Sequence, residues 1–126
     1  MNTTTRAVIE QHWAFANRRD WGNFELLLAP DLRYEVPQTC EYIESGAGYL
    51  DMFRTWPGEW QAMIKTMVCE ETKAVSIIDF VVGTEVVVGV SVFEVIAGKI
   101  LAVTDYWPEP YEPPPRQSSH MRRRPR

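Results

Sequence analysis

The sequence predicts an α+β fold in which helices come first and a mostly antiparallel sheet follows. Three observations lead to this prediction. The first half of the chain has apolar residues at helical spacing, the second half consists of β-branched runs, and the connections between these runs are short. Short connections join antiparallel neighbours, and a sheet covered by helices on one face can curl into a strongly curved, half-open cone.

Two helices are expected before the first strand. The first covers residues 5–19, with Thr4 or Thr5 available as its cap. Its predicted apolar face consists of Val8, Ile9, His12, Trp13 and Ala16. The segment Asp20-Trp21-Gly22 interrupts this pattern, and residues 23–30 predict a short second helix that ends before Pro30.

A strand and a third helix follow. Residues 32–36 alternate as a strand that places Leu32, Tyr34 and Val36 on one face, and Pro37 ends it. After a polar loop, Ser45 is expected to cap a helix over residues 48–56, which stops at a Pro-Gly pair. The apolar stripe of this third helix contains Tyr49, Met52, Phe53 and Trp56.

The remainder of the domain predicts four strands, at residues 60–70, 73–82, 86–96 and 99–107. Two of these strands carry an acid within an apolar run. By the two-residue period of a strand, Asp105 shares a face with Val103 and Trp107, and Asp79 shares a face with Ile77. Two acids in such places suggest a lined cavity, although Asp79 could instead bond to buried donors or face solvent.

The composition predicts one domain over residues 1–112, which includes three N-terminal helices, and a flexible Pro-rich and basic tail over residues 113–126. Without the five arginines after the last strand, eight basic residues remain against 17 acidic ones, so the net charge of this part is about −9. Nucleic acid is therefore not an expected partner. No run is long enough to span a membrane, and the N-terminus lacks the pattern of a signal peptide.

These features favour a cytoplasmic protein in which Cys40 and Cys69 are reduced thiols. The chain has two His and two Cys but no CxxC, HExxH or His-x-His motif, so no metal site is expected. Residues 46–48 do not complete a Gly-rich nucleotide loop, so nucleotide binding is not expected. Ser91 lies within a strand and not at a strand-to-helix elbow, so a serine-hydrolase nucleophile is not expected either. We therefore expect chemistry that needs no cofactor.

The order of elements, together with the segments DW, LLAPDLRYE and GKILAVTDYWPEPYEPP, resembles the NTF2-like superfamily over residues 6–112. Its SnoaL-like and ketosteroid-isomerase-like branch is the most similar. The resemblance implies a conical α+β barrel with a deep pocket between sheet and helices, and a homodimer. It does not imply one chemistry, because members include isomerases, cyclases, dehydratases, epoxide hydrolases and proteins without catalysis.

Comparison with individual branches gives expectations for single residues. Relative to limonene epoxide hydrolases, the chain keeps Tyr34, Asp79 and Asp105, but Val36 and Ile77 stand where an Asn and an Arg are expected. Relative to ketosteroid isomerases, Val36 stands at the position of the general base. The second acid of the oxyanion hole would lie near Ser91, and His12 stands at the position of the helix Tyr. Steroid isomerisation is therefore not favoured. SnoaL-type cyclases use an acid of the last strand, which again indicates Asp105.

We predict four catalytic residues from these arguments. Asp105 is the expected base, Asp79 its partner or the acid, and Tyr34 a donor to a developing oxyanion. His12 could shuttle a proton or polarise a carbonyl, or be a core histidine with its hydrogen bonds satisfied. The expected substrate-binding residues are Trp13, Val36, Tyr49, Phe53, Trp56, Ser91 and Val103.

Three functions remain open at this level. The first is a cofactor-independent acid/base enzyme that cyclises, isomerises or opens the epoxide of a small apolar, oxygenated molecule such as a polyketide or terpenoid. The second is a non-catalytic binding protein whose acids satisfy buried donors, which the missing Arg and Asn favour. The third is an assembly module that uses the outer sheet face and the YEPPP segment. A raised pKa at Asp79 or Asp105 would distinguish the enzyme from the other two functions.

Overall fold

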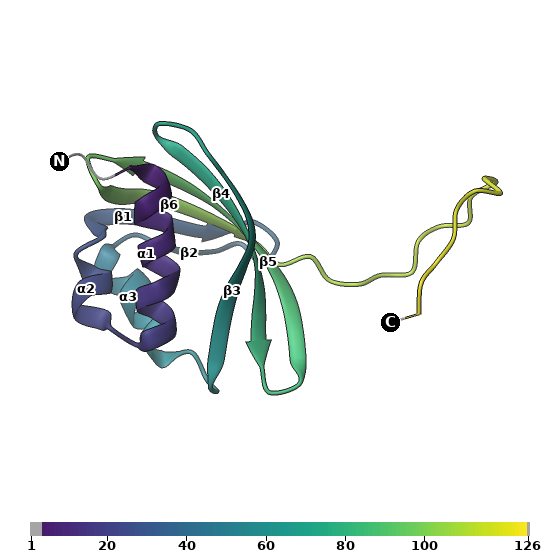
Figure 1. The fold of residues 1–126 in the computed structure, drawn as a ribbon, viewed down its shortest axis with the longest axis horizontal. Helices are drawn as coiled ribbons and strands as arrows, with labels where there is room; N and C mark the ends of the chain where they lie inside the picture. Colours follow the sequence, from purple (N-terminus) through teal and green to yellow (C-terminus); the bar gives the residue numbers. More distant parts are fainter. Residues whose placement is uncertain (1–3, 126) are drawn as a thin grey trace.

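The computed structural model describes residues 4–125 as one layer of helices packed against one curved sheet (Figure 1). The helices are α1 (Thr5–Arg18), α2 (Trp21–Glu25) and α3 (Gly46–Thr55). The strands are β1 (Leu28–Val36), β2 (Glu41–Ile43), β3 (Trp60–Cys69), β4 (Lys73–Val82), β5 (Glu85–Ile96) and β6 (Lys99–Tyr106). Their order in the sheet is β2-β1-β6-β5-β4-β3, and every pair is antiparallel except β1 with β6. This is the predicted α+β architecture.

The ends of the two long helices follow from local sequence. Thr4 caps α1, because its side chain accepts a hydrogen bond from the Ala7 amide at 3.1 Å. At the other end Arg19 has the left-handed conformation, with φ 58°, and its amide donates to the carbonyl of Ala16. Ser45 caps α3 by accepting from the Gly48 amide at 2.9 Å, as the sequence predicts.

The segment between α1 and α3 differs from the sequence-based expectation. Helix α2 ends at Glu25, four residues earlier than predicted, and β1 begins at Leu28. The leucine run at 26–28 fits a helix or a strand equally well, so its local pattern does not decide the boundary. Pro30 is accommodated within β1 because the pairing of β1 with β6 shifts register between Leu28 and Arg33. The short strand β2 was not predicted.

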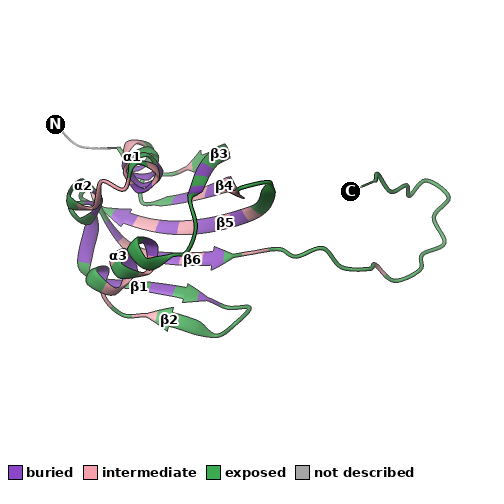
Figure 2. Cartoon of the chain, turned by 90° about the horizontal axis from the view of Figure 1, so that it is seen from below, coloured by how far each residue is buried: buried purple, intermediate pink, exposed green. Residues whose placement is uncertain are grey.

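The sheet has two faces with different roles. On the inner face, toward the helices, lie side chains such as Ile78, Phe93 and Val103, each at most 1% exposed. Figure 2 shows this burial as alternating colours along β5 and β6 beneath the helices. On the outer face, alternate residues of β4 and β5 are only half-buried. The core therefore fills the space between sheet and helices, where the site is found.

Residues 107–125 have no regular secondary structure apart from a turn, and they extend away from the folded domain on the side opposite the helices (Figures 1 and 2). Within this segment Arg123 forms an ion pair with Glu112 at 2.9 Å. The extended path is the one expected for a Pro-rich sequence.

Candidate functional site

Asp105 lies on the inner face of β6, where the register of the sheet brings two hydroxyl groups to its carboxylate. Ser91 is directly opposite Asp105 on β5, and its Oγ donates a hydrogen bond to Asp105 Oδ1 at 2.6 Å. Tyr34 pairs with Val103 across β1 and β6, and its hydroxyl donates to Asp105 Oδ2 at 2.7 Å. Asp105 is only 4% exposed. Each carboxylate oxygen thus has one donor, which offsets part of the cost of removing the group from water.

These surroundings change the acidity of both partners. Burial raises the pKa of Asp105 above its ordinary value, while the hydrogen bonds from Ser91 and Tyr34 act in the opposite direction. Burial also raises the pKa of Tyr34, with a further contribution from the neighbouring Asp105 charge. Asp105 is therefore an acid whose ionised form is disfavoured by dehydration but already has its donors in place, an arrangement that suits proton exchange.

A small cavity, which we call the Asp105 chamber, lies beside this carboxylate and has a volume of about 30 Å³. Among the described residues that line the chamber, Asp105 is the one with a charge, and most of the others are aromatic. The lining consists of Trp13, Tyr34, Met52, Phe53, Trp56, Trp60, Phe80, Asp105 and Trp107.

The chamber adjoins a larger open space, the outer groove, of about 440 Å³. Four residues, Tyr34, Met52, Trp56 and Trp107, line both spaces and so form the wall between them. The remaining lining residues of the outer groove are Val36, Thr39, Cys40, Glu41, Tyr42 and Ile43. A ligand that approaches Asp105 from this groove must pass this wall.

His12 and Tyr49 form a second buried polar pair behind the chamber. His12 Nε2 and the Tyr49 hydroxyl share a hydrogen bond of 2.7 Å, and neither residue lines the chamber. Burial lowers the pKa of His12 to about 3, so the imidazole is neutral at physiological pH. His12 Nδ1 has no hydrogen-bond partner among residues 4–125. The Tyr49 ring lies 5.3 Å from that of Tyr34, which bonds Asp105, so these two tyrosines connect His12 to the carboxylate.

Asp79 does not belong to this site, which corrects the expectation that both acids line one cavity. In β4 it lies between Ile78 and Phe80, which face inward, and therefore it faces outward. Its carboxylate is 3.7 Å from Lys65 Nζ, with the Asp79 side chain 30% exposed. A predicted role of Asp79 as partner of Asp105 is incompatible with this placement.

The other predicted site residues divide into three groups. Trp13, Phe53 and Trp56 line the chamber, and Val36 lines the outer groove. Ser91 contacts the carboxylate directly, as described above. Tyr49 and Val103 are buried next to the site, at 1% exposure each, without lining either space.

Four lining residues were not among the predicted site residues: Met52, Trp60, Phe80 and Trp107. A signal for two of them was present in the sequence. Trp107 follows Asp105 by two positions and so shares its face, and Phe80 lies on the face opposite Asp79. Once Asp105 is placed inward, strand alternation places Trp107 beside it. Which face of β4 points inward, and therefore whether Phe80 lines the chamber, is decided only by the assembled sheet.

Within residues 4–125, no three side chains of His, Cys, Asp or Glu come close enough together to hold a metal ion. In the same part of the chain, no helix has the length and apolar character needed to cross a membrane.

The fold and the chamber define a class of protein in which helices close a curved sheet over a pocket that contains an acid. The model of the SnoaL-like domain family matches residues 9–103. The chain therefore belongs to the SnoaL-like family, and its fold is NTF2-like. No protein with a curated function has a significantly similar sequence.

Solved structures agree with this assignment. A proposed ketosteroid isomerase from Kribbella flavida DSM 17836 is 40% identical, with a TM-score of 0.90 over 96% of this chain and 90% of that one. An LEH-like epoxide hydrolase of M. tuberculosis is 20% identical, with a TM-score of 0.68 and 80% of each chain covered. A proposed SnoaL-like polyketide cyclase from Shewanella putrefaciens CN-32 is 12% identical, with a TM-score of 0.70 over 81% of this chain and 78% of that one. The last two similarities concern the fold alone.

Proposed function

We propose that the protein is a cofactor-independent enzyme in which Asp105 transfers a proton on a small, mostly apolar molecule that carries a carbonyl or hydroxyl group. The observation that supports this best is the carboxylate itself, 4% exposed, bonded to two hydroxyls and surrounded by aromatic walls. Such walls bind an apolar ligand, and the dehydrated acid provides the reactive group.

A single acid favours chemistry in which the same proton leaves and returns. The Asp105 carboxylate removes a proton from a carbon next to a carbonyl, the electron pair moves to the carbonyl oxygen, and the proton is then delivered to another carbon of the same molecule. This describes an isomerisation. In a cyclisation the enolate carbon attacks a second carbonyl of the same molecule, and Asp105 returns its proton to the alkoxide oxygen that forms. Epoxide opening by water is less favoured, because Asp79, the second acid expected for it, lies outside the chamber.

The Tyr34 hydroxyl can serve both stages of this transfer. While Asp105 is ionised, Tyr34 donates to it at 2.7 Å. When Asp105 takes up the proton, it is no longer a charged acceptor, and the Tyr34 hydrogen is free to turn toward the oxyanion that forms on the substrate. A donor that is already in place stabilises such an oxyanion without a large rearrangement.

The test compares Asp105→Asn with Asp79→Asn on a panel of apolar enones and diketones. Turnover is followed by ultraviolet absorbance and binding by calorimetry. We expect Asp105→Asn to lower kcat by about 10² to 10⁴-fold, the usual contribution of a positioned acid or base, while binding survives. Asp79→Asn should leave both unchanged. If Asp105→Asn turns over substrate as fast as wild type, Asp105 is not the base.

A non-catalytic binding protein is the second candidate. The observation that favours it is the volume of the chamber, which at about 30 Å³ leaves little room for a reacting group unless a wall residue moves. In that case the acid would serve the buried hydroxyls of Ser91 and Tyr34. Tight binding of panel members with no turnover by wild type would establish this alternative.

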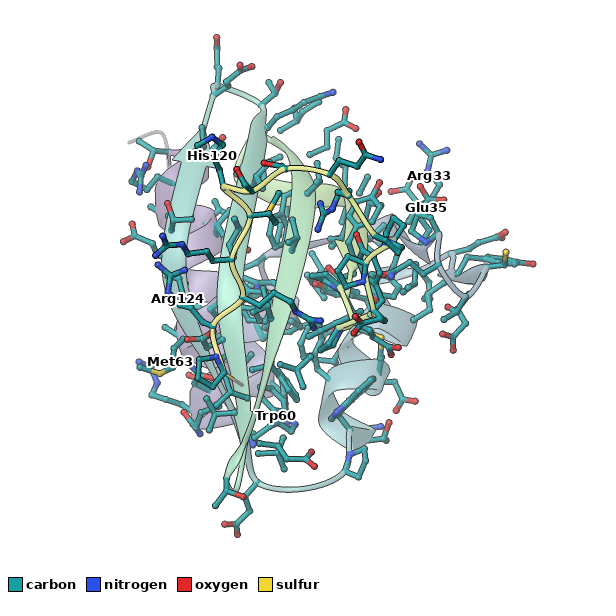
Figure 3. The ribbon with its side chains drawn as sticks, turned by 90° about the vertical axis from the view of Figure 1, so that its right-hand side faces the viewer. Arg33, Glu35, Trp60, Met63, His120 and Arg124 are labelled. Carbon is teal, nitrogen blue, oxygen red and sulfur yellow. The ribbon has the colours of Figure 1, made fainter. Side chains whose placement is uncertain are left out.

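We infer further that the outer sheet face pairs with a second copy of the chain. Its half-buried and exposed side chains are largely apolar, and they include Met63 at 57% and Val86 at 58% exposure. Figure 3 faces this side of the sheet, with Met63 near one edge and Arg33 and Glu35 projecting near the other. Val90 lies on the same face, half-buried in β5 between Ile77 and Tyr106. Val90→Lys should halve the mass measured by light scattering and leave the circular dichroism spectrum unchanged. A monomeric wild type would contradict the inference.

A further inference from the structure

The last inward residue of the β6 run, Trp107, is held by a side chain and not by a neighbouring strand. Strand β6 ends at Tyr106, and Pro108 follows Trp107 without an amide hydrogen to continue the sheet. The Trp107 amide donates to Gln38 Oε1 at 2.7 Å, and the Trp107 carbonyl accepts from Gln38 Nε2 at 3.2 Å. The carboxamide thus replaces the two bonds that one residue of a neighbouring antiparallel strand would make.

The position of Gln38 explains why this is possible. It lies two residues beyond the end of β1, the strand that pairs in parallel with β6. The same arrangement occurs elsewhere in the molecule, where the Asn17 side chain bonds both the amide and the carbonyl of Ala62 in β3, at 2.7 and 2.8 Å. A carboxamide at a strand edge is therefore used twice in this fold to hold extended backbone.

The extended backbone at Trp107 places its indole on the face of Asp105, two residues earlier. The ring fits there because residue 89 is glycine: a Cβ at Gly89 would lie 2.8 Å from Trp107 Cζ3. The ring also packs edge-on against Phe80, with centroids 5.6 Å apart. Two bonds to the backbone and two contacts to the ring thus define one position for the indole.

In this position Trp107 forms part of the wall of three spaces. It lines the Asp105 chamber, the outer groove and a third, open groove of about 290 Å³ between Trp56 and Val87. Trp56 lines all three as well, but it is 46% exposed at the end of α3. The indole of Trp107, which is the better anchored of the two, thus borders both the chamber of the carboxylate and the two surface grooves.

We propose that Gln38 is a positioning residue that, through Trp107, keeps the Asp105 chamber closed and thereby sets the size of the substrate group that reaches the acid. The inference rests on the proposed function in one respect, that the chamber is where the reacting group binds. The substrate that fits has a narrow carbonyl or hydroxyl end for the chamber and a larger apolar remainder for the outer groove, whose volumes are about 30 and 440 Å³.

The test is a comparison of Gln38→Ala and Gln38→Glu with a matched control, Gln61→Ala. Gln61 is also exposed, and it donates a single bond to the carbonyl of Asn17 at 3.2 Å without lining the chamber. Two signals are recorded with no ligand present. One is the titration of the Asp105 carboxyl by ¹³C NMR, and the other is the ¹⁹F spectrum of protein labelled with fluorotryptophan, in which Trp107 is assigned from Trp107→Phe.

In Gln38→Ala we expect water to reach Asp105, so that its pKa falls toward the ordinary value. The ¹⁹F signal of Trp107 should broaden or shift, and that of Trp21, which lines none of the three spaces, should not. Gln38→Glu keeps the acceptor and loses the donor, and it should give an intermediate change in the ¹⁹F signal. Because Gln38 is exposed, all variants should remain folded.

An unchanged Asp105 titration together with an unchanged Trp107 signal in Gln38→Ala would overturn the proposal, and so would equal changes in Gln61→Ala. These readouts do not require turnover. If the proposed enzyme activity is absent but the chamber opens in Gln38→Ala, the positioning role stands and only the catalytic function fails. If wild type turns over substrate but the Asp105 titration and the Trp107 signal do not change in Gln38→Ala, the catalytic function stands and the positioning role fails.

Discussion

Asp105 and Asp79 occupy the same kind of place in the sequence, an acid within a β-branched run, yet they lie on opposite faces of one sheet. Asp105 faces the helices, is bonded to the hydroxyls of Tyr34 and Ser91, and has a raised pKa. Asp79 faces outward and has Lys65 nearby, with both side chains partly in solvent. The same residue type therefore becomes a buried, hydrogen-bonded acid or a surface charge according to its face alone.

The two faces also differ in how tightly their residues are packed. The inner face contacts α1 and α3 through closely packed aromatic rings, with His12 at ring-centroid distances of 4.4 to 5.9 Å from five neighbours. The outer face has no such cover among the described residues. Substitutions on the inner face should thus affect the whole fold, and those on the outer face should have local effects.

The largest difference is expected between two adjacent residues of β5. Phe93 is 1% exposed and faces His12, whereas Val92 faces outward and is half-buried. Phe93→Ala should lower the free energy of unfolding by about 3 to 5 kcal/mol, because it leaves a cavity in a packed core. Val92→Ala should cost clearly less. Urea denaturation at equal protein concentration measures both, and equal costs would contradict the comparison.

The next largest effect concerns His12 and pH. Its folded pKa of about 3 lies below the ordinary value of 6.5, so between these values the unfolded chain binds more protons and stability falls as pH falls. One pKa unit corresponds to about 1.4 kcal/mol, so the whole effect amounts to several kcal/mol. His12→Gln removes the titration. Its stability relative to wild type should rise as pH is lowered from 7 to 5, in thermal melts at each pH.

Asp105 should show the opposite sign. Its folded pKa is raised, so above the ordinary value of 3.8 the unfolded chain ionises first, and stability falls as pH rises toward the folded pKa. The Asn side chain of Asp105→Asn cannot ionise, so this variant does not lose stability in this way. Relative to wild type, it should become more stable as pH rises from 4. A difference between the two proteins that does not change with pH would show that burial has not raised the pKa of Asp105.

The smallest effect is expected on the outer face. The carboxylate of Asp79 lies 3.7 Å from Lys65 Nζ, and the side chains are 30% and 54% exposed. Ion pairs in such places contribute about 0 to 1 kcal/mol and are weakened by salt. Asp79→Asn should therefore change the melting temperature little, and added salt should reduce the difference further. A large, salt-independent loss would mean that Asp79 has a structural role on the outer face.

Much of the secondary structure could be predicted from local patterns. Thr4 and Ser45 cap their helices by side-chain bonds to an amide three residues later, a signal contained within four residues. Strand β2 could not be predicted in this way, because it has three residues and is a strand only through its pairing with β1. The start of β1 at Leu28 likewise depends on its partner β6.

The site was predictable only to the extent that it depends on local patterns. Strand alternation places Asp105 with Val103 and Trp107, whichever way that face points. Alternation also places Asp79 with Ile77, but it cannot tell which side of β4 the helices cover. The prediction was therefore correct that Asp105 shares its face with core residues, and wrong that Asp79 joins it. His12 was placed correctly on the buried face of α1, but not its position behind Tyr49.

The sequence by itself determined the two long helices with their caps, the four long β-branched strands and the presence of an acid within the last one, because each of these depends on neighbours a few residues away. Only the tertiary structure decided that the hydroxyls of Tyr34 and Ser91 meet Asp105, across separations of 71 and 14 residues. It also decided that Gln38 reaches Trp107, 69 residues away. Such contacts depend on the register of paired strands and on which face the helices cover, and a local sequence pattern specifies neither.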